Sequence, residues 1–186
     1  QRDRVMMTTM GIASEQELAA VALALGARGV APWSEAERAL ASAAPTLDPS
    51  VVARFREQIA VGHDPLGDVF CALRSSVERR SQGATYTPLP IVTAMLAWAG
   101  RQAHPDRVVD AGAGSGRFIV NAGRSFPDAA LVAVEMDPLA AMLARAHLAV
   151  AGLQTRARVL VADFRSAPLR PFAGRTLFTG NPPYVR

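Results

Sequence analysis

Lysine is absent from this chain of 186 residues, so all 20 of its basic residues are arginine. Against 16 acidic residues, the arginines leave a formal net charge of +4. The planar fork of arginine suits phosphate groups, but a composition rich in alanine and arginine also reflects the base composition of coding DNA. The charge alone therefore gives only modest support to a nucleic-acid partner.

Cysteine is almost absent as well, because Cys71 is the only one and cannot form an internal disulfide. A reducing cytoplasm fits this usage, and a catalytic thiol is the alternative reading of Cys71. The three histidines, His63, His104 and His147, lack the spacing of metal ligands, so we expect no metal. No apolar run is long enough to cross a bilayer and the residues around Met6 are no secretory signal, so we expect no membrane partner.

Residues 1–80 contain four sequence signals for the start of a helix. Two are capping boxes, with a serine three positions before a glutamate, and two place an aspartate before a proline at the first helical position. These signals are Ser14 with Glu17, Ser34 with Glu37, Asp48-Pro49 and Asp64-Pro65. We therefore expect four helices, which present apolar stripes at Leu18, Val21, Ala22 and Leu25 and at Val52, Phe55 and Ile59.

This helical region contains no catalytic constellation, so a packing role is favoured and contact with DNA or a protein partner is the alternative. Unless other observations indicate a partner, its arginines are expected to lie at the surface in water and not to contact phosphate. Those best placed to contact phosphate are Arg54, Arg56, Arg74, Arg79 and Arg80.

Beyond a polar hinge at 81–84, apolar runs alternate with helical segments. The runs end near residues 109, 135, 162 and 179, and the helices are expected at 88–99, 115–123 and 138–151. Thr87 is expected to cap the first of these helices, with Pro88 at its first position. Such alternation predicts a parallel, doubly wound sheet, in which the carboxyl ends of the strands meet at one edge and bind the ligand there.

The first apolar run ends in a glycine-rich loop. Val108 and Val109 are typical of a buried parallel strand, and Asp110 then leads into alternating glycines from Gly112 to Gly116. The spacing is G-x-G-x-G, whereas a dinucleotide loop has G-x-G-x-x-G and seats a pyrophosphate. An acid at this position repels a pyrophosphate but suits a cation, such as a sulfonium that also carries an α-amino group. A single glycine loop is a weak signal, so the neighbouring motifs decide.

Those motifs resemble the class I S-adenosylmethionine-dependent methyltransferases. Residues 110–116 resemble the first motif of that family, Glu135 lies about 20 residues further on, where an acid binds ribose hydroxyls, and Asp163-Phe164 resembles the pair that binds adenine. The resemblance implies an α/β fold: a Rossmann-like class I methyltransferase sheet, of which this chain holds the cofactor-binding half with about four parallel strands, preceded by the helical N-terminal region. The implied domains are 1–80 and 81–186. The implied residues for S-adenosyl-L-methionine are Thr87, Asp110, Ala111, Gly112, Gly114, Glu135, Met136, Asp163, Phe164 and Asn181.

The catalytic motif is the run from Gly180 to Tyr184, Gly-Asn-Pro-Pro-Tyr. In the family, the asparagine side chain and the carbonyl of the first proline accept both hydrogens of an exocyclic amine, and the tyrosine stacks on a base swung out of the duplex. By resemblance Asn181, Pro182 and Tyr184 take these roles. The segment Tyr86-Thr87-Pro88 resembles the amino-directed DNA methyltransferases, and asparagine at the head of the motif favours adenine N6 over cytosine N4.

The resemblance thus implies a site-specific DNA adenine-N6 methyltransferase of a restriction-modification or related defence system. Double-stranded DNA is the implied partner, bound through a recognition domain that this chain lacks. One alternative is a protein methyltransferase acting on glutamine N5, whose family also uses Asn-Pro-Pro-Tyr, and RNA amino-methyltransferases are another. A third is a catalytically incomplete cofactor-binding fragment, because four strands are about half of a seven-stranded sheet. We accordingly expect the chain to be the N-terminal part of a longer polypeptide.

Overall fold

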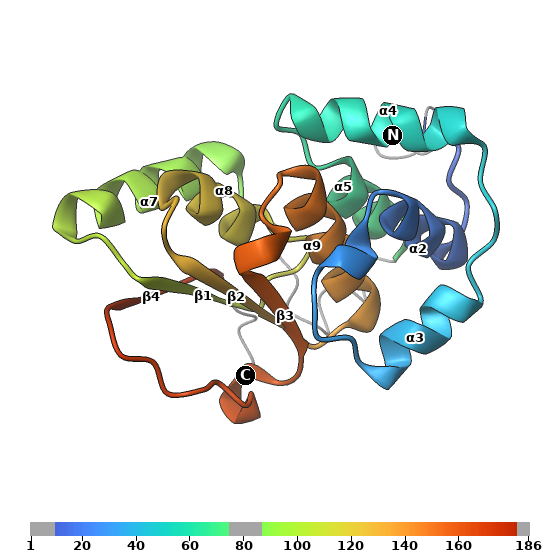
Figure 1. Ribbon diagram of the computed structural model, residues 1–186. Coiled ribbons are helices and arrows are strands. Elements are labelled where there is room, and N and C mark those ends of the chain that lie inside the picture. The colour runs from blue at the N-terminus through green and yellow to red at the C-terminus, as the bar shows by residue number, and fades with distance from the viewer. Residues whose placement is uncertain (1–9, 75–86, 182–186) are drawn as a thin grey trace.

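In a computed structural model, which describes residues 10–74 and 87–181, the described residues form one parallel sheet with the strand order β3-β2-β1-β4 (Figure 1). Val108 pairs with Leu131 on one side and with Leu177 on the other, so the strands lie in register. The strands are β1 (Arg107–Ala111), β2 (Ala130–Glu135), β3 (Ala157–Val161) and β4 (Thr176–Thr179). The predicted α/β fold with about four parallel strands is confirmed.

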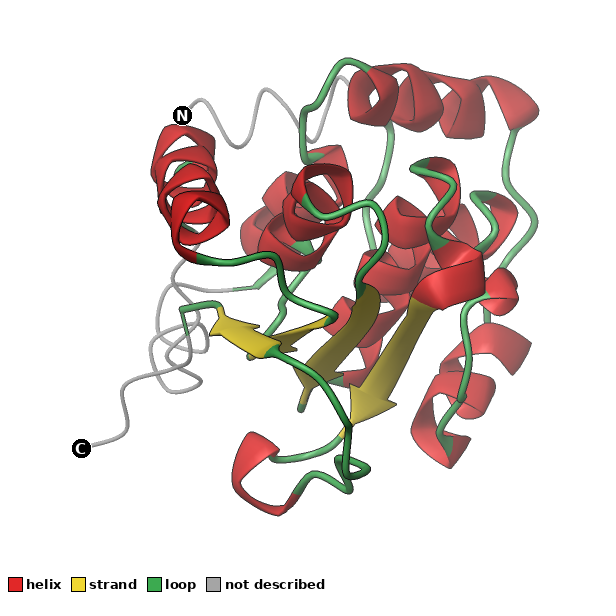
Figure 2. Ribbon diagram, turned by 60° about the vertical axis from the view of Figure 1, so that its left-hand side comes forward, coloured by secondary structure: helices red, strands yellow, loops and turns green. Residues whose placement is uncertain are grey.

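Three helices cover one face of this sheet. They are α7 (Leu89–Gln102), α8 (Arg117–Ser125) and α9 (Pro138–Val150). Alternate strand residues such as Val108, Leu131 and Val159 point toward these helices and are fully buried in a core shared with them. Figure 2 shows the helices on this side of the yellow strands, and the loop that carries the short helix η3 (Phe164–Ser166) on the other.

The start of α7 differs from the prediction. Pro88 occupies the N-cap position with φ −56° and ψ 138°, and no side chain caps the helix. Leu89 is the first helical residue and Pro90 the second, so the helix begins one residue later than expected and Pro88 lies just outside it. The prediction that Thr87 caps this helix is therefore wrong, and its buried hydroxyl has no hydrogen-bond partner among the described residues.

In the N-terminal region, four α-helices begin at the predicted caps. Ser14, Asp48 and Asp64 each accept a hydrogen bond from a backbone amide of the first turn, and Ser34 with Glu37 forms a complete capping box. At Ser14 the box is incomplete, because the Glu17 carboxylate accepts from the amide of Ala13 instead. The helices are α2 (Glu15–Ala24), α3 (Glu35–Ser42), α4 (Pro49–Ala60) and α5 (Pro65–Leu73).

These helices share a hydrophobic core with α9. The predicted stripe residues Leu18 and Phe55 are fully buried there, beside Met142 and Leu143 of α9. Thus α9 has one side on the sheet and another on the N-terminal helices (Figure 1). The division of the chain at residues 80 and 81 remains a prediction.

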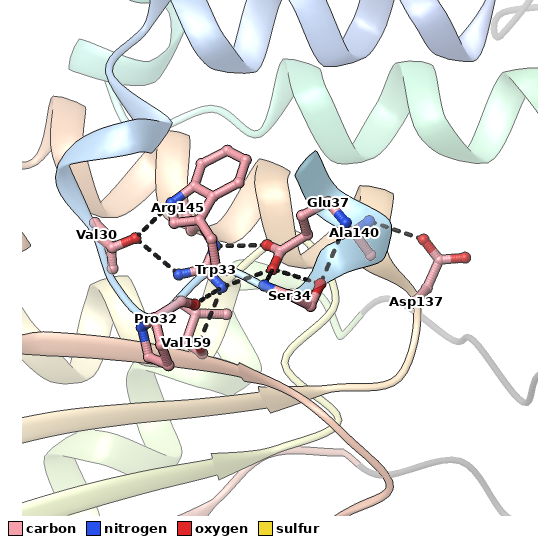
Figure 3. A network of polar contacts seen from close by, with 9 residues as sticks. All are labelled: Val30, Pro32, Trp33, Ser34, Glu37, Asp137, Ala140, Arg145 and Val159. Carbon is pink, nitrogen blue, oxygen red and sulfur yellow. Dashed lines mark hydrogen bonds and ion pairs between the residues drawn. The ribbon is translucent and has the colours of Figure 1, made fainter. Parts of the chain in front are cut away.

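A buried arginine joins the N-terminal region to both α9 and β3 (Figure 3). Arg145 of α9 is inaccessible to solvent and donates from Nε and Nη2 to the two carboxylate oxygens of Glu37, at 2.6 and 3.1 Å. Its remaining hydrogen bonds go to the carbonyl oxygens of Val30, Pro32 and Val159, at 2.8, 2.6 and 3.0 Å. Every partner other than Val159 belongs to the N-terminal region, so this contact fixes that region against the outer strand of the sheet.

The opposite edge of the sheet is apolar and open. Among the described residues, no strand pairs with the outer side of β4. Phe178 of β4 and Trp98 of α7 are 57% and 60% exposed, and both line a cavity of about 850 Å³ that extends to Ala111 and Gly180. Apolar surface of this extent suits packing against further protein.

Candidate functional site

The loops that follow β1, β2 and β3 are joined by backbone hydrogen bonds at the carboxyl edge of the sheet. The amides of Gly112 and Ala113 both donate to the carbonyl oxygen of Val134, at 2.9 and 3.0 Å, and the amide of Ala162 donates to that of Glu135 at 3.0 Å. The residues expected at strand ends, from Asp110 to Asn181, therefore lie along one edge, as parallel strands require.

The glycine loop needs its glycines for two different reasons. Gly112, Gly114 and Gly116 have φ values of +75°, +54° and +97°, which residues with a Cβ rarely adopt. At Gly116 space is also limiting, because a Cβ would lie 3.1 Å from Cα of Ala144 in α9. Gly116 thus permits the close packing of α8 against α9, while Gly112 and Gly114 shape the loop at the strand tip.

Asp110 lies buried beneath this loop. Its Oδ2 accepts a hydrogen bond from the amide of Ile119 at 2.9 Å, whereas its buried Oδ1 has no hydrogen-bond partner in the part of the chain that the structure describes. Burial raises the pKa of Asp110 to about 7; the Ile119 hydrogen bond opposes this rise and the charge of Glu135 adds to it. A buried acceptor without a donor is costly, so a proton or a positively charged donor group at Oδ1 would stabilise it.

The end of β4, which leads into the predicted catalytic motif, lies against Asp110. Gly180 has φ +123°, and a Cβ there would lie 2.6 Å from Asp110 Oδ1 and 2.9 Å from the carbonyl oxygen of Ala111. Only glycine permits this approach, which brings Asn181 beside the glycine loop. Pro182 and Tyr184, the other predicted catalytic residues, lie outside the described residues.

Glu135, the predicted ribose-binding acid, bridges the first two loops. Its Oε2 accepts from the amide of Gly114 at 2.7 Å and its Oε1 from the amide of Asp137 at 2.9 Å. Burial raises the pKa of Glu135, and these amide hydrogen bonds oppose the rise. Each carboxylate oxygen keeps acceptor capacity for a further donor such as a hydroxyl. The neighbouring Met136, predicted to line the adenine pocket, is 62% exposed.

Asp163 and Phe164 begin η3 at the third strand end. Asp163 accepts from the amide of Arg165 at 2.9 Å and forms an ion pair with its side chain, and these contacts hold the pKa of Asp163 below its usual value. The Phe164 ring meets Phe178 edge to face, with centroids 6.3 Å apart. The Arg165 side chain is 84% exposed, so the ion pair is in solvent and contributes little to stability.

Sequence reasoning missed a polar cluster behind the glycine loop. Asp64 was interpreted only as a helix cap, yet it also accepts from Oγ of Ser115 at 2.6 Å and from Nε of Arg117 at 2.7 Å. Arg74 was a candidate phosphate contact, which the structure corrects. Its side chain is 15% exposed, and its guanidinium pairs with Glu15 and Asp137. The Asp-Pro pair predicted the cap, but no local pattern indicated these distant partners.

Neither a metal-binding cluster nor a membrane-spanning helix was found within the described ranges 10–74 and 87–181. No group of three or more His, Cys, Asp or Glu side chains is arranged to hold a metal ion. None of the helices described there is long and apolar enough to cross a membrane.

Comparison with known proteins gives a relative that matches nearly the whole chain. The type II methyltransferase M.XamI of Xanthomonas campestris pv. amaranthicola is 47% identical over 180 residues, which are 95% of this chain and 34% of that protein. A tRNA1(Val) (adenine(37)-N6)-methyltransferase of Porphyromonas gingivalis is 31% identical over 96 residues, 48% of this chain and 38% of that protein. The chain therefore spans only about a third of the length of these relatives. No protein-family model matches the sequence.

Among solved structures, the methyltransferase subunit of a type I restriction-modification system from Streptococcus thermophilus is 25% identical, with a TM-score of 0.45. The match covers 73% of this chain and 32% of that one. A modification subunit of a putative type I restriction enzyme from Vibrio vulnificus is 19% identical, with a TM-score of 0.41, over 61% of this chain and 27% of the other.

Proposed function

We propose that this chain belongs to the same methyltransferase family as M.XamI, to which it is 47% identical, and is the cofactor-binding part of an S-adenosylmethionine-dependent DNA adenine-N6 methyltransferase. The observation that carries the proposal is the contact of Gly180 with Asp110, because it puts the end of the Asn181 strand beside the glycine loop. A donor site and an acceptor-rich motif at one sheet edge are what methyl transfer to an amine requires.

The acids at this edge fit a positively charged cofactor. Asp110 has an unpartnered buried oxygen, and Glu135 keeps acceptor capacity toward the loop, so a sulfonium compound with an α-amino group suits the site and a pyrophosphate does not. S-Adenosylmethionine supplies an electrophilic methyl group when bound. We assign its binding to the carboxyl ends of the four strands, with the loop after β1, and to the residue ahead of Pro88, through Thr87, Asp110, Ala111, Gly112, Gly114, Glu135, Met136, Asp163, Phe164 and Asn181.

The chain's own part in the chemistry is to prepare the amine. The lone pair of an exocyclic amino group is delocalised into the base, which makes the nitrogen a poor nucleophile. We assign to the Asn181 side-chain oxygen and the Pro182 carbonyl the role of accepting both amine hydrogens, which moves the nitrogen toward tetrahedral geometry. Tyr184 is assigned to stack on a base flipped out of the duplex. Positioning and fixed dipoles, without a covalent intermediate, supply the catalysis.

The substrate proposal is adenine in double-stranded DNA, within a restriction-modification system. It is supported by the 47% identity to a type II methyltransferase and by the adenine-N6 activity in the name of the second relative. Sequence recognition is assigned to a part of the full-length protein outside this chain. A glutamine-N5 methyltransferase is not favoured, because these relatives offer no support for it.

The cofactor proposal is tested by titration calorimetry on the full-length gene product that contains this chain. We expect binding of S-adenosylmethionine and of its product S-adenosylhomocysteine, and no binding of NAD. Binding of NAD alone would overturn the assignment, because it would mean that the loop seats a pyrophosphate.

The substrate proposal is tested with cofactor labelled in the methyl group and with duplex DNA, tRNA and a glutamine-containing release factor as acceptors. We expect label in DNA, recovered as N6-methyladenine. Asn181→Ala should abolish transfer and leave the cofactor dissociation constant nearly unchanged, whereas Asp110→Ala should weaken cofactor binding. Label in tRNA or protein alone would refute the DNA assignment, and equal loss of cofactor affinity in both variants would refute the division of roles.

A further inference from the structure

We propose that helix α5 holds the two loops of the cofactor site in place, with Asp64 at one end and Arg74 at the other acting as positioning residues. The two residues are the N-cap and the C-cap of the same helix, and each contacts one of the two loops that follow β1 and β2. This inference rests on the proposed function, because it takes those loops to be the cofactor-binding ones.

The N-cap end of α5 holds the loop that follows β1. The Asp64 carboxylate accepts from the amide of Gly67 at 2.8 Å through Oδ1, and through Oδ2 from Ser115 Oγ and Arg117 Nε at 2.6 and 2.7 Å. Ser115 is the residue between the second and third loop glycines. The helix lies so close that a Cβ at Gly67 would be 2.7 Å from Ser115 Oγ. Asp64 therefore fixes both a side chain of the loop and the first residue of α8.

Further contacts extend this anchor to other parts of the site. Arg117 also donates from Nη1 to the carbonyl oxygen of Thr87 and pairs through Nη2 with Asp68, both at 3.3 Å. His147 of α9 hydrogen-bonds through Nδ1 to the carbonyl oxygen of Ser115 at 2.8 Å. Because a carbonyl can only accept, Nδ1 is the donor there. The loop is thus fixed at Ser115 from both its side chain and its backbone.

The C-cap end of α5 holds the loop that follows β2. Arg74 pairs through Nη1 with Asp137 Oδ2 at 2.5 Å and through Nε with Glu15 of α2 at 2.7 Å. Its guanidinium also lies 4.3 Å from the centroid of the Phe70 ring. Asp137 in turn caps α9 through Oδ1 and donates its amide to Glu135. Since Glu135 also accepts from Gly114, the second anchor connects back to the first loop.

These contacts matter because glycine loops lose much conformational entropy when a ligand orders them. Fixing the backbone of a residue costs conformational entropy, and glycine loses the most. When α5 holds the loops in advance, this cost is met in folding and does not weaken binding. In metal sites, loss of the groups that orient the ligands lowers affinity by about 10- to 100-fold, and we expect an effect of this size here.

The variants are chosen to remove each anchor while keeping the helix. Asp64→Asn remains a good N-cap and can still accept from Gly67, but its amide nitrogen would face the Arg117 donor. Arg74→Met keeps the apolar stem over Phe70 and removes both ion pairs. Phe55→Leu is the matched control: it weakens the fully buried core of α4, and Phe55 lies outside both loops.

The experiment measures two quantities on the full-length protein, under conditions where each variant is folded. The first is the dissociation constant for S-adenosylhomocysteine. We expect it to rise about 10- to 100-fold in Asp64→Asn and Arg74→Met and to change less than about twofold in Phe55→Leu, even where Phe55→Leu lowers the urea midpoint as much. If the affinities simply follow the midpoints, or all stay at the wild-type value, the inference is overturned.

The second quantity is amide hydrogen exchange of the protein without ligand. We expect faster exchange at residues 112–117 in Asp64→Asn and at residues 135–137 in Arg74→Met, and in neither segment in Phe55→Leu. This result separates the two proposals. If the wild type fails to bind the probe, the proposed function fails, and exchange still decides whether α5 holds the loops. Unchanged exchange in both loops would overturn the inference.

Discussion

Replacement of Arg145 by methionine should strongly lower the free energy of unfolding, because Arg145 joins the N-terminal region to the sheet. Arg145 and Glu37 are both inaccessible to solvent, with Nε and Oε1 2.6 Å apart (Figure 3). Methionine fills much of the same volume but leaves the Glu37 carboxylate buried without its cation. Breaking such a pair from one side costs about 3–5 kcal/mol.

A second substitution, at Glu37, should recover part of this loss in the free energy of unfolding. In Arg145→Met, Glu37 keeps its capping-box donors, the amide and Oγ of Ser34, at 2.8 and 2.9 Å. Adding Glu37→Gln removes the buried charge and keeps an acceptor for the Ser34 amide. The double variant should therefore be more stable than Arg145→Met alone. It should not reach the wild type, because the buried carbonyl oxygen of Val159 still lacks its donor, at about 1–3 kcal/mol.

Urea unfolding followed by tryptophan fluorescence measures both effects. Trp33 lies 5.3 Å from the Arg145 guanidinium, so its emission reports on this contact. The slope of the free energy against urea should stay the same in all three variants, including Glu37→Gln alone, if only native-state contacts change. A loss below about 1 kcal/mol in Arg145→Met, or a double variant no more stable than that single one, would refute the reasoning.

Three further predictions concern the glycine loop and its surroundings. The folded state keeps the Asp110 proton up to about pH 7, whereas the unfolded state releases it near pH 4. The free energy of unfolding should therefore fall as the pH rises from about 4 to about 7, by at most about 4 kcal/mol. In urea titrations at several pH values, Asp110→Asn should flatten this profile. In the same urea titrations, Gly116→Ala should lower the free energy of unfolding by about 1–3 kcal/mol more than Gly62→Ala does. Both glycines have φ above +90°, but only Gly116 faces Ala144. Equal losses in the two variants would contradict the packing argument. Thr87→Val should leave the urea midpoint nearly unchanged, because Oγ1 makes no hydrogen bond with the described residues. The same variant should weaken cofactor binding measured by calorimetry. An unaltered affinity would refute the assignment of Thr87 to the cofactor site.

The sequence by itself determined the local elements of this protein. The β-branched runs, the alternating glycines after Asp110 and the caps at Ser34 and Asp64 each encode their structure within a few residues. Parallel strands then bring their carboxyl ends to one edge without further information. The exception, the start of α7, failed because two prolines lie two residues apart and either one can occupy the first turn.

The tertiary structure alone decided which distant groups hold the site loops and the N-terminal region in place. Ser115 meets Asp64 across 51 residues, Asp137 meets Arg74 across 63, and Arg145 meets Glu37 across 108. From its sequence neighbours alone, each partner is interpreted as a helix cap or a surface charge. No periodic pattern connects residues so far apart. Burial chooses these pairs, because a charge removed from water must find a partner wherever the fold places one.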